Sequence, residues 1–181
     1  MNYFNKIDSE NIYLSPISLD DGPMYIKWLS NPEISKYLHN SSRIFNIISE
    51  NEWINNILKN GDYIFSIIRK SDDSLIGNIG FNEINNIDRT ATLGIFIGDA
   101  DNQNKGYGSE AIRALIKYGF DVLNLNNIDL HVFDFNERAI ACYKKVGFKE
   151  YGRRHKSYYL NGVYHDDIYM EILRDNYYEK N

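Results

Sequence analysis

Cysteine is nearly absent from the chain, because Cys142 is the single copy among 181 residues. No internal disulfide can form, and a chain without disulfides suits a reducing compartment, so we expect the cytoplasm. Proline is scarce too, with three copies, and no segment rich in Pro, Gly or Ser divides the sequence. We therefore expect a single domain over residues 1–181.

Long apolar runs are also missing. No stretch approaches the roughly 18 apolar residues of a membrane-spanning helix, and residues 1–6 lack the apolar run of a signal peptide, so we expect no membrane partner. The net charge of −5 is spread along the chain, without the basic stripe of a nucleic-acid binder. This acidic balance mildly favours cationic substrates such as amines, and 43% apolar residues are enough for a folded core.

The hydrophobic periodicity predicts a mixed α/β chain, in which an antiparallel meander precedes a β-loop-α-β-α unit. The predicted strands cover 11–17, 63–69, 75–81, 91–98, 128–133, 151–159 and 163–173, and the predicted helices cover 18–31, 33–38, 48–58, 109–123 and 137–146. A crossover helix implies that strands 91–98 and 128–133 are parallel neighbours. Asn161-Gly162 predicts a hairpin turn, and helix 48–58 is expected to bury Trp53, Ile54, Ile57 and Leu58.

The most informative segment, residues 95–111, runs from a strand through a loop into a helix. Gly106 and Gly108 lack a Cβ, so their backbone can approach a ligand closely. The following helix presents free N–H groups and the positive end of its dipole, which together suit a pyrophosphate. Lys105 adds positive charge, and Ser109 can cap the helix or contact a phosphate. A simple tight turn into a helix would use the same residues.

Two other nucleotide motifs are excluded, and with them an ATP- or NAD-dependent enzyme. The P-loop needs a Gly-Lys-Ser/Thr end, and the dinucleotide fingerprint needs a third glycine and a later acidic residue. Instead, Gln103-x-x-Gly106-x-Gly108 is similar to the pyrophosphate signature of the GCN5-related N-acetyltransferases, the GNAT family. Residues 136–148 resemble the second signature of that family, and residues 152–166 resemble its ribosomal-protein and spermidine N-acetyltransferase branches.

The resemblance covers nearly the whole chain and implies an acetyl-CoA-dependent N-acetyltransferase that needs no metal. The acceptor would be the primary amine of a small molecule or a peptide, such as a protein N-terminus, a polyamine or an amino sugar. The implied fold is a mixed seven-stranded sheet, splayed between its fourth and fifth strands and flanked by about four or five helices. By analogy, a homodimer through the final strands fits the family.

The resemblance also implies which residues hold acetyl-CoA. Strand residues would offer backbone groups to the pantetheine arm, the loop would hold the pyrophosphate, and the second signature would flank the thioester. The pantetheine residues are Ile95, Phe96 and Ile97; the pyrophosphate residues are Gln103, Asn104, Lys105, Gly106, Tyr107, Gly108 and Ser109; the flanking residues are Asn136, Ala139 and Tyr143.

Tyr143 is the candidate acid that protonates the departing thiolate. Ala139 and Tyr143 are four residues apart, so they share one helix face with Asn136 near its start. A phenol with a pKa of ~10 protonating a thiolate whose thiol has a pKa of ~8.5 is uphill by roughly 2 kcal/mol, which positioning and exclusion of water must offset. Alternatively, Tyr143 only donates a hydrogen bond to the sulfur, or it is an aromatic side chain of the core. We interpret the neighbouring Cys142 as a packing residue and not as a covalent nucleophile.

The sequence alone does not decide which residue is the general base. Related enzymes often carry a glutamate where this sequence has Thr92. Glu83, acting through a water, and His131 are the two candidates, whereas His155 and His165 are interpreted as polar surface. A site without a strong base favours acceptor amines of low pKa, such as a peptide α-amine, because these are more often neutral at pH 7. A non-catalytic acyl-CoA-binding module of the same fold is the alternative function.

Overall fold

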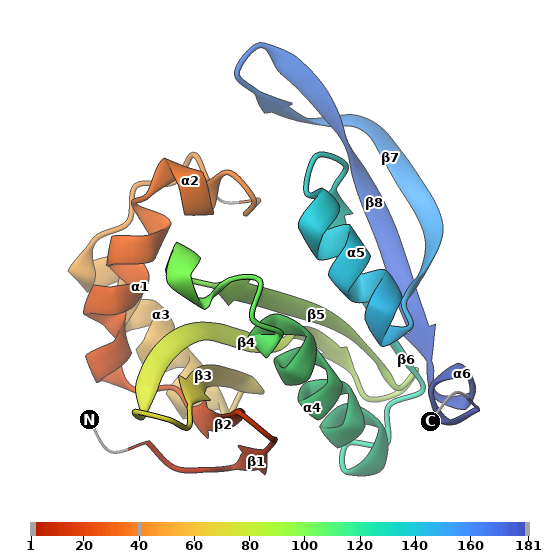
Figure 1. The fold of residues 1–181 in the computed structure, drawn as a ribbon, viewed down its shortest axis with the longest axis horizontal. Helices are drawn as coiled ribbons and strands as arrows, with labels where there is room; N and C mark the ends of the chain where they lie inside the picture. The colour runs from red at the N-terminus through yellow and green to blue at the C-terminus, as the bar shows by residue number, and fades with distance from the viewer. Residues whose placement is uncertain (1–2, 40, 180–181) are drawn as a thin grey trace. The chain divides into compact units, whose positions relative to one another are not determined.

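The computed structural model describes residues 3–39 and 41–179, and these form two compact units (Figure 1). The first unit comprises Met1–Phe81 and Ile95–Leu115, and the second comprises Asn82–Gly94 and Ile116–Asn181. The single domain therefore stays a prediction. Within the described ranges, no helix is long and apolar enough to span a membrane.

Eight strands hydrogen-bond in the order β1-β2-β3-β4-β5-β6-β8-β7 in the described part of the chain. Their bounds are β1 Ile7–Asp8, β2 Ile12–Pro16, β3 Ile64–Arg69, β4 Ser74–Asn85, β5 Thr90–Ile97, β6 Asn127–Phe133, β7 Lys149–Leu160 and β8 Val163–Leu173. Strands β4 and β5 cross the boundary between the units. The sheet has one strand more than the predicted seven, because the two residues of β1 pair with β2.

The helices follow the predicted order, with one addition at the end of the chain. Their bounds are α1 Gly22–Leu29, α2 Pro32–Ser35, α3 Ile47–Asn60, α4 Tyr107–Asp121, α5 Glu137–Val146 and α6 Arg174–Tyr178, with short 3₁₀ turns η1 Leu19–Asp21 and η2 Ala100–Asn102. The five residues of α6 and the two of β1 are too short to show a hydrophobic period, so the sequence did not predict them.

One predicted helix face is partly wrong. In α3, Ile54 and Ile57 are buried as expected, but Trp53 is 38% exposed and Leu58 is 46% exposed. The third buried position is Glu50. Positions 50, 54 and 57 form a narrow stripe along the helix, and Trp53 and Leu58 lie at the two margins of that stripe.

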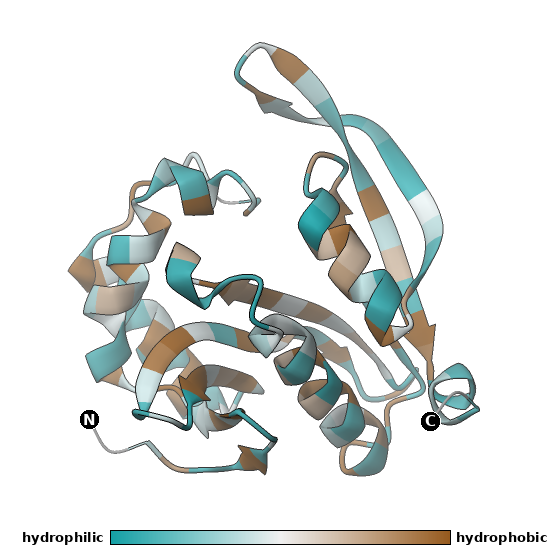
Figure 2. Cartoon of the chain, viewed as in Figure 1, coloured by the Kyte–Doolittle hydropathy of each residue, from teal (hydrophilic) through white to brown (hydrophobic). Residues whose placement is uncertain are grey.

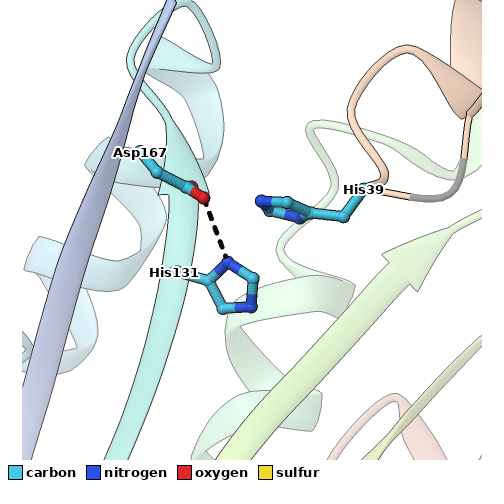
Figure 3. Close-up of side chains that lie close together, drawn as sticks. All are labelled: His39, His131 and Asp167. Atoms are coloured by element: carbon cyan, nitrogen blue, oxygen red, sulfur yellow. Dashed lines mark ion pairs between the residues drawn. The ribbon is translucent and has the colours of Figure 1, made fainter. Parts of the chain in front are cut away.

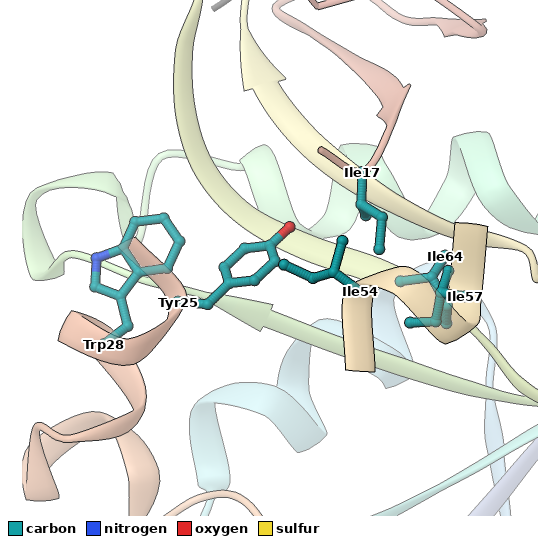
Figure 4. Close-up of a cluster of buried hydrophobic side chains, with 6 residues drawn as sticks. All are labelled: Ile17, Tyr25, Trp28, Ile54, Ile57 and Ile64. Atoms are coloured by element: carbon teal, nitrogen blue, oxygen red, sulfur yellow. The ribbon is translucent and has the colours of Figure 1, made fainter. Parts of the chain in front are cut away.

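The core of the first unit is a cluster of aliphatic and aromatic side chains between α1, α3 and the sheet (Figure 4). Trp28 is 1% exposed in this cluster, and its ring lies against Gly98, directly after β5. A Cβ on Gly98 would come within 2.1 Å of the Trp28 ring, so only glycine allows this approach. The packing fixes the point at which the chain leaves β5.

The second unit contains the parallel pair that the crossover helix predicted. Ala91 of β5 pairs with Ile128 of β6, and the parallel ladder covers only three residue pairs, Thr90–Thr92 with Asn127–Asp129. Strands β6, β8 and β7 continue in antiparallel order. Figure 2 shows β7 as mainly hydrophilic, whereas β8 carries several hydrophobic residues.

The turn between β7 and β8 has the predicted chemistry. Asn161 and Gly162 both have positive φ, 49° and 88°, as a two-residue hairpin requires. Beside the turn, Tyr159, Val163 and Tyr164 are exposed. These exposed side chains lie on the final strands, where the resemblance implies a homodimer, which stays a prediction.

Candidate active site

The loop after β5 is held in place from within the first unit. The Gln103 side chain donates a hydrogen bond to the carbonyl of Ile97 (3.3 Å), across the loop that it closes. Asn102 is buried and its Oδ1 accepts from Nη1 of Arg69 (2.7 Å). Asn104 has a positive φ of 59°, which asparagine tolerates better than most residues. The conformation of the loop is therefore fixed by side-chain hydrogen bonds.

The two glycines of this loop leave space above the start of α4. Gly106 has a φ of 88°, and an added Cβ would meet no described atom within 4 Å. On Gly108 an added Cβ would only make an ordinary contact of 3.8 Å with Ile97. Protein packing therefore does not exclude a side chain at either position, and the space fits a ligand that approaches the backbone, such as a pyrophosphate.

The first turn of α4 is anchored on both sides. The Ser109 hydroxyl donates to the carbonyl of Gly106 (2.8 Å). The Glu110 carboxylate accepts from the backbone N–H groups of Asn11 (2.7 Å) and Ile12 (3.2 Å), at the start of β2. Because the Ser109 hydroxyl hydrogen is used within the loop, its backbone N–H is the donor that remains for an anion.

The far half of β5 is half-buried over Ile95, Phe96 and Ile97. On one side, the N–H of Gly98 still donates to the carbonyl of Ile76 in β4 (2.9 Å). On the other side, the ladder with β6 ends at Thr92, so in the described chain residues 95–97 are outside that ladder. An unpaired strand edge is the geometry that accepts an extended amide-containing ligand.

In the second unit, α5 presents the residues of the second signature. Asn136 is its N-cap, and Oδ1 of Asn136 accepts from the N–H of Ala139 (3.3 Å). Ala139 is half-buried and Tyr143, one turn later, is 8% exposed. The Tyr143 ring packs edge-on against Phe148, with centroids 5.9 Å apart. Asn136 therefore has a structural role as the helix cap. Ala139 and Tyr143, four residues apart on α5, lie on the same face of the helix, as predicted.

Burial raises the pKa of Tyr143 well above its usual value near 10, with a smaller contribution from Cys142. The phenol therefore stays protonated at neutral pH and can donate a hydrogen bond. The same shift makes full proton transfer to a thiolate more uphill than an ordinary phenol would. This favours donation to the sulfur as charge develops on it.

His131 is exposed on β6 and has an acidic partner that the sequence did not reveal. Nδ1 of His131 lies 3.5 Å from Oδ2 of Asp167 on β8 (Figure 3). Asp167 is 5% exposed, and the His131 ring stacks on Tyr169 at 5.9 Å. The antiparallel register places His131 opposite Tyr169 and Asp167 opposite Phe133. Only that register brings the two side chains together, so no local pattern could have indicated Asp167.

Glu83, the other candidate base, lies at the end of β4 and is exposed. It lines a cavity of about 390 Å³ whose wall also includes Asn85, Thr90, Thr92 and Asp129. Thr92, at the position of the family glutamate, pairs with Asp129 in the parallel ladder. The structure thus places Glu83, Thr92 and Asp129 around one hollow in the second unit.

His155 and His165, the two histidines of the final hairpin, are polar, as interpreted, but each has a carboxylate partner. Nδ1 of His155 lies 2.9 Å from Asp166, and Nδ1 of His165 lies 2.9 Å from Asp134. His155 is largely exposed and His165 is half-buried. The His155–Asp166 pair joins the two strands of the final hairpin, and the His165–Asp134 pair connects β8 to the residue that follows β6.

Comparison with known proteins identifies the family. A model described as the acetyltransferase (GNAT) domain matches residues 11–149. An uncharacterised N-acetyltransferase p20 of Bacillus licheniformis is 33% identical, over 80% of this chain and 82% of that protein. Spermidine N(1)-acetyltransferase of Escherichia coli K12 is 36% identical over 59% of this chain and 56% of that protein.

The fold has a close match among solved structures. Spermidine N-acetyltransferase from Vibrio cholerae, crystallised with CoA and spermine, superposes with a TM-score of 0.84 and 28% identity, over 93% of this chain and 98% of that chain. The chain belongs to the GNAT acetyltransferase family. It is an acyltransferase of the N-acetyltransferase type, and the predicted mixed α/β GNAT fold is confirmed.

Proposed function

We propose that this protein moves the acetyl group of acetyl-CoA onto a primary amine by direct attack in a ternary complex. The observation that carries the proposal is the glycine loop, where space over Gly106 and Gly108 opens at the start of α4. Acetyl-CoA supplies the activated acetyl thioester. The loop backbone and Lys105 bind its pyrophosphate, while the edge at residues 95–97 binds its pantetheine arm.

Tyr143 acts at the leaving sulfur in this proposal. Its phenol is protonated at neutral pH, as an ordinary phenol is, and burial raises its pKa further. It donates a hydrogen bond to the sulfur as negative charge develops there. Ala139, on the same helix face, keeps the approach to the phenol open because it has only a methyl side chain. Asn136 starts the helix that carries both residues.

The His131–Asp167 pair acts as the general base. Asp167 lies beside Nδ1, which favours the tautomer with the proton on Nδ1 and makes Nε2 the basic nitrogen, which accepts a proton from the amine. A lysine-like amine is neutral about once in 2,500 molecules at pH 7, a deficit of about 4.6 kcal/mol. A positioned base offsets part of that deficit, so amines of high pKa become acceptable substrates.

We expect His131→Asn to lower kcat about 10²-fold with an acceptor of high pKa, and less with an acceptor of low pKa, because only the former depends strongly on the base. Steady-state rates with both amines measure this. His155→Asn is the matched control, since His155 also pairs with a carboxylate. Equal losses with both amines, or a full loss in Glu83→Gln alone, would assign the base elsewhere.

The proposed function is tested by two measurements on the same protein. Calorimetric titration measures acetyl-CoA binding, and thiol release with a panel of primary amines measures turnover. We expect both binding and amine-dependent thiol release. Binding with no turnover on any amine would favour the alternative, a non-catalytic acyl-CoA-binding module. No binding at all would reject both functions.

A further inference from the structure

The glycine loop, residues 103–109, is anchored to the sheet through an arginine side chain. Arg69 is the last residue of β3. Its Nε and Nη2 donate to the two oxygens of the Asp72 carboxylate (2.9 and 2.7 Å), the two-pronged geometry that arginine favours. Asp72 also accepts from the hydroxyl and the backbone N–H of Ser74 (2.8 and 3.3 Å). The turn after β3 therefore fixes the orientation of the guanidinium.

The third nitrogen of this guanidinium binds the segment that leads into the glycine loop. Nη1 of Arg69 donates to Oδ1 of Asn102 (2.7 Å). Asn102 is 8% exposed and is the last residue of η2, directly before the loop. A hydrogen bond from a charged donor is stronger than a neutral one, and its loss would leave a buried acceptor unsatisfied. Arg69 therefore fixes the position at which the chain enters the loop.

Tyr107, between the two glycines of the loop, also interacts with Arg69. It is half-buried, and it is the only residue of Gly106-Tyr107-Gly108 that has a side chain. Asp72 contributes most to raising the pKa of the Arg69 guanidinium, and the Tyr107 hydroxyl adds smaller charge and hydrogen-bond contributions. The guanidinium thus interacts with the chain just before the loop and with the loop's central side chain.

The other end of the glycine loop is held at the same row of the sheet. Glu110 follows the loop directly, and its carboxylate accepts from the N–H groups of Asn11 and Ile12 (2.7 and 3.2 Å). Ile12 is opposite Arg69 in the antiparallel register of β2 and β3. Two paired residues of the sheet therefore hold the two ends of the loop. A loop that is ordered in this way before a ligand arrives loses less conformational entropy on binding.

We propose that Arg69 is a positioning residue, which holds the glycine loop in the conformation that binds the pyrophosphate of acetyl-CoA. Its Nε and both Nη atoms already donate to Asp72 and Asn102, so it acts through the loop. The inference rests on the proposed function and adds to it a residue outside both signature segments. The acetyl thioester is at the other end of the pantetheine arm, so losing Arg69 weakens cofactor binding and leaves the chemical step unchanged.

The test uses Arg69→Lys, which keeps one positive charge but lacks the planar fork, so it cannot hold Asp72 and Asn102 in the same way. We expect the Kd for CoA, measured by calorimetry, and the KM for acetyl-CoA to rise about tenfold, with kcat within about twofold of the wild type. Arg153→Lys is the matched control and should bind CoA like the wild type. Arg153, on β7, also pairs with a carboxylate three residues away, Glu150 (3.2 Å).

A shorter acetyl donor separates positioning of the loop from a general loss of structure. S-acetylpantetheine has the thioester and the pantetheine arm of acetyl-CoA but no pyrophosphate. In Arg69→Lys, we expect kcat/KM to fall about tenfold with acetyl-CoA and to stay unchanged with S-acetylpantetheine. Equal falls with both donors would show that Arg69 only stabilises the fold, and would overturn the inference.

A second variant removes the same contact from the side of the loop. Asn102→Leu has a similar size, lacks the acceptor and leaves the Arg69–Asp72 pair in place. Its CoA affinity should fall as in Arg69→Lys, and the double variant should lose little more than either single variant, because both remove one interaction. Full additivity, or wild-type CoA affinity in both single variants, overturns this inference alone. No CoA binding by the wild type overturns the proposed function as well.

Discussion

Replacing Tyr143 with phenylalanine should lower kcat about 10²-fold or more and leave the affinity for acetyl-CoA nearly unchanged. The phenol is held by burial and by the edge-on contact with Phe148, and phenylalanine retains both. Only the donor to the sulfur is lost, so the effect should fall on the chemical step. Single-turnover thiol release and calorimetric titration of acetyl-CoA separate the two quantities.

Tyr178→Phe is the control for this substitution, because it removes a phenol of α6 that bonds Asp121 and is outside the proposed site. The thermal midpoint of Tyr143→Phe should stay near that of the wild type, since the Tyr143 hydroxyl forms no hydrogen bond with the described residues of the fold. A variant that turns over at the wild-type rate would remove Tyr143 from the chemistry and leave it as a core aromatic.

Substituting Gly106 with valine should weaken CoA binding by about tenfold or more. The loop has room for the added side chain, since an added Cβ meets no described atom within 4 Å, but the side chain would occupy the space proposed for the pyrophosphate. The positive φ of 88° adds backbone strain of about 1–2 kcal/mol for a residue other than glycine. Calorimetry with CoA measures the affinity.

Gly162→Val is a closely matched control for Gly106→Val. Gly162 has the same φ of 88° and the same open space around it, but lies in the hairpin turn between β7 and β8. Both variants carry the same backbone strain, so a difference in CoA affinity isolates the position. If the two variants bind CoA equally well, the loop does not hold the pyrophosphate.

Local patterns in the sequence were sufficient for most of the fold. The bounds of α5 and β8 agree with the predicted ranges, and the crossover rule correctly predicted that strands 91–98 and 128–133 are parallel neighbours. Helix α3 ends at Asn60, two residues beyond the predicted end at residue 58, with Gly61 in the left-handed region. These features depend on neighbours close in sequence or on one topological rule, and they could therefore be predicted from the sequence.

Only the part of the candidate site that lies within one segment of the chain could be predicted from the sequence. Glycines and a helix start predict a phosphate loop from the sequence because the chemistry is local to one segment. The partner of His131 and the acidic cavity depend on registers between strands, as in the pairing of Asp167 with Phe133 and of Thr92 with Asp129. Such registers join residues that are far apart in the sequence, 34 positions for Phe133 and Asp167 and 37 for Thr92 and Asp129. No period in the sequence encodes them.

The buried tyrosines have a consequence for how the protein tolerates alkali. Tyr143 and Tyr25 are both nearly inaccessible, and burial raises the pKa of each well above 10. In the unfolded chain these phenols ionise near pH 10, whereas in the native fold they do not. Their contribution to stability is complete below about pH 10 and is lost as the pH climbs through the higher native values, so strong base should open both units by charging their interiors.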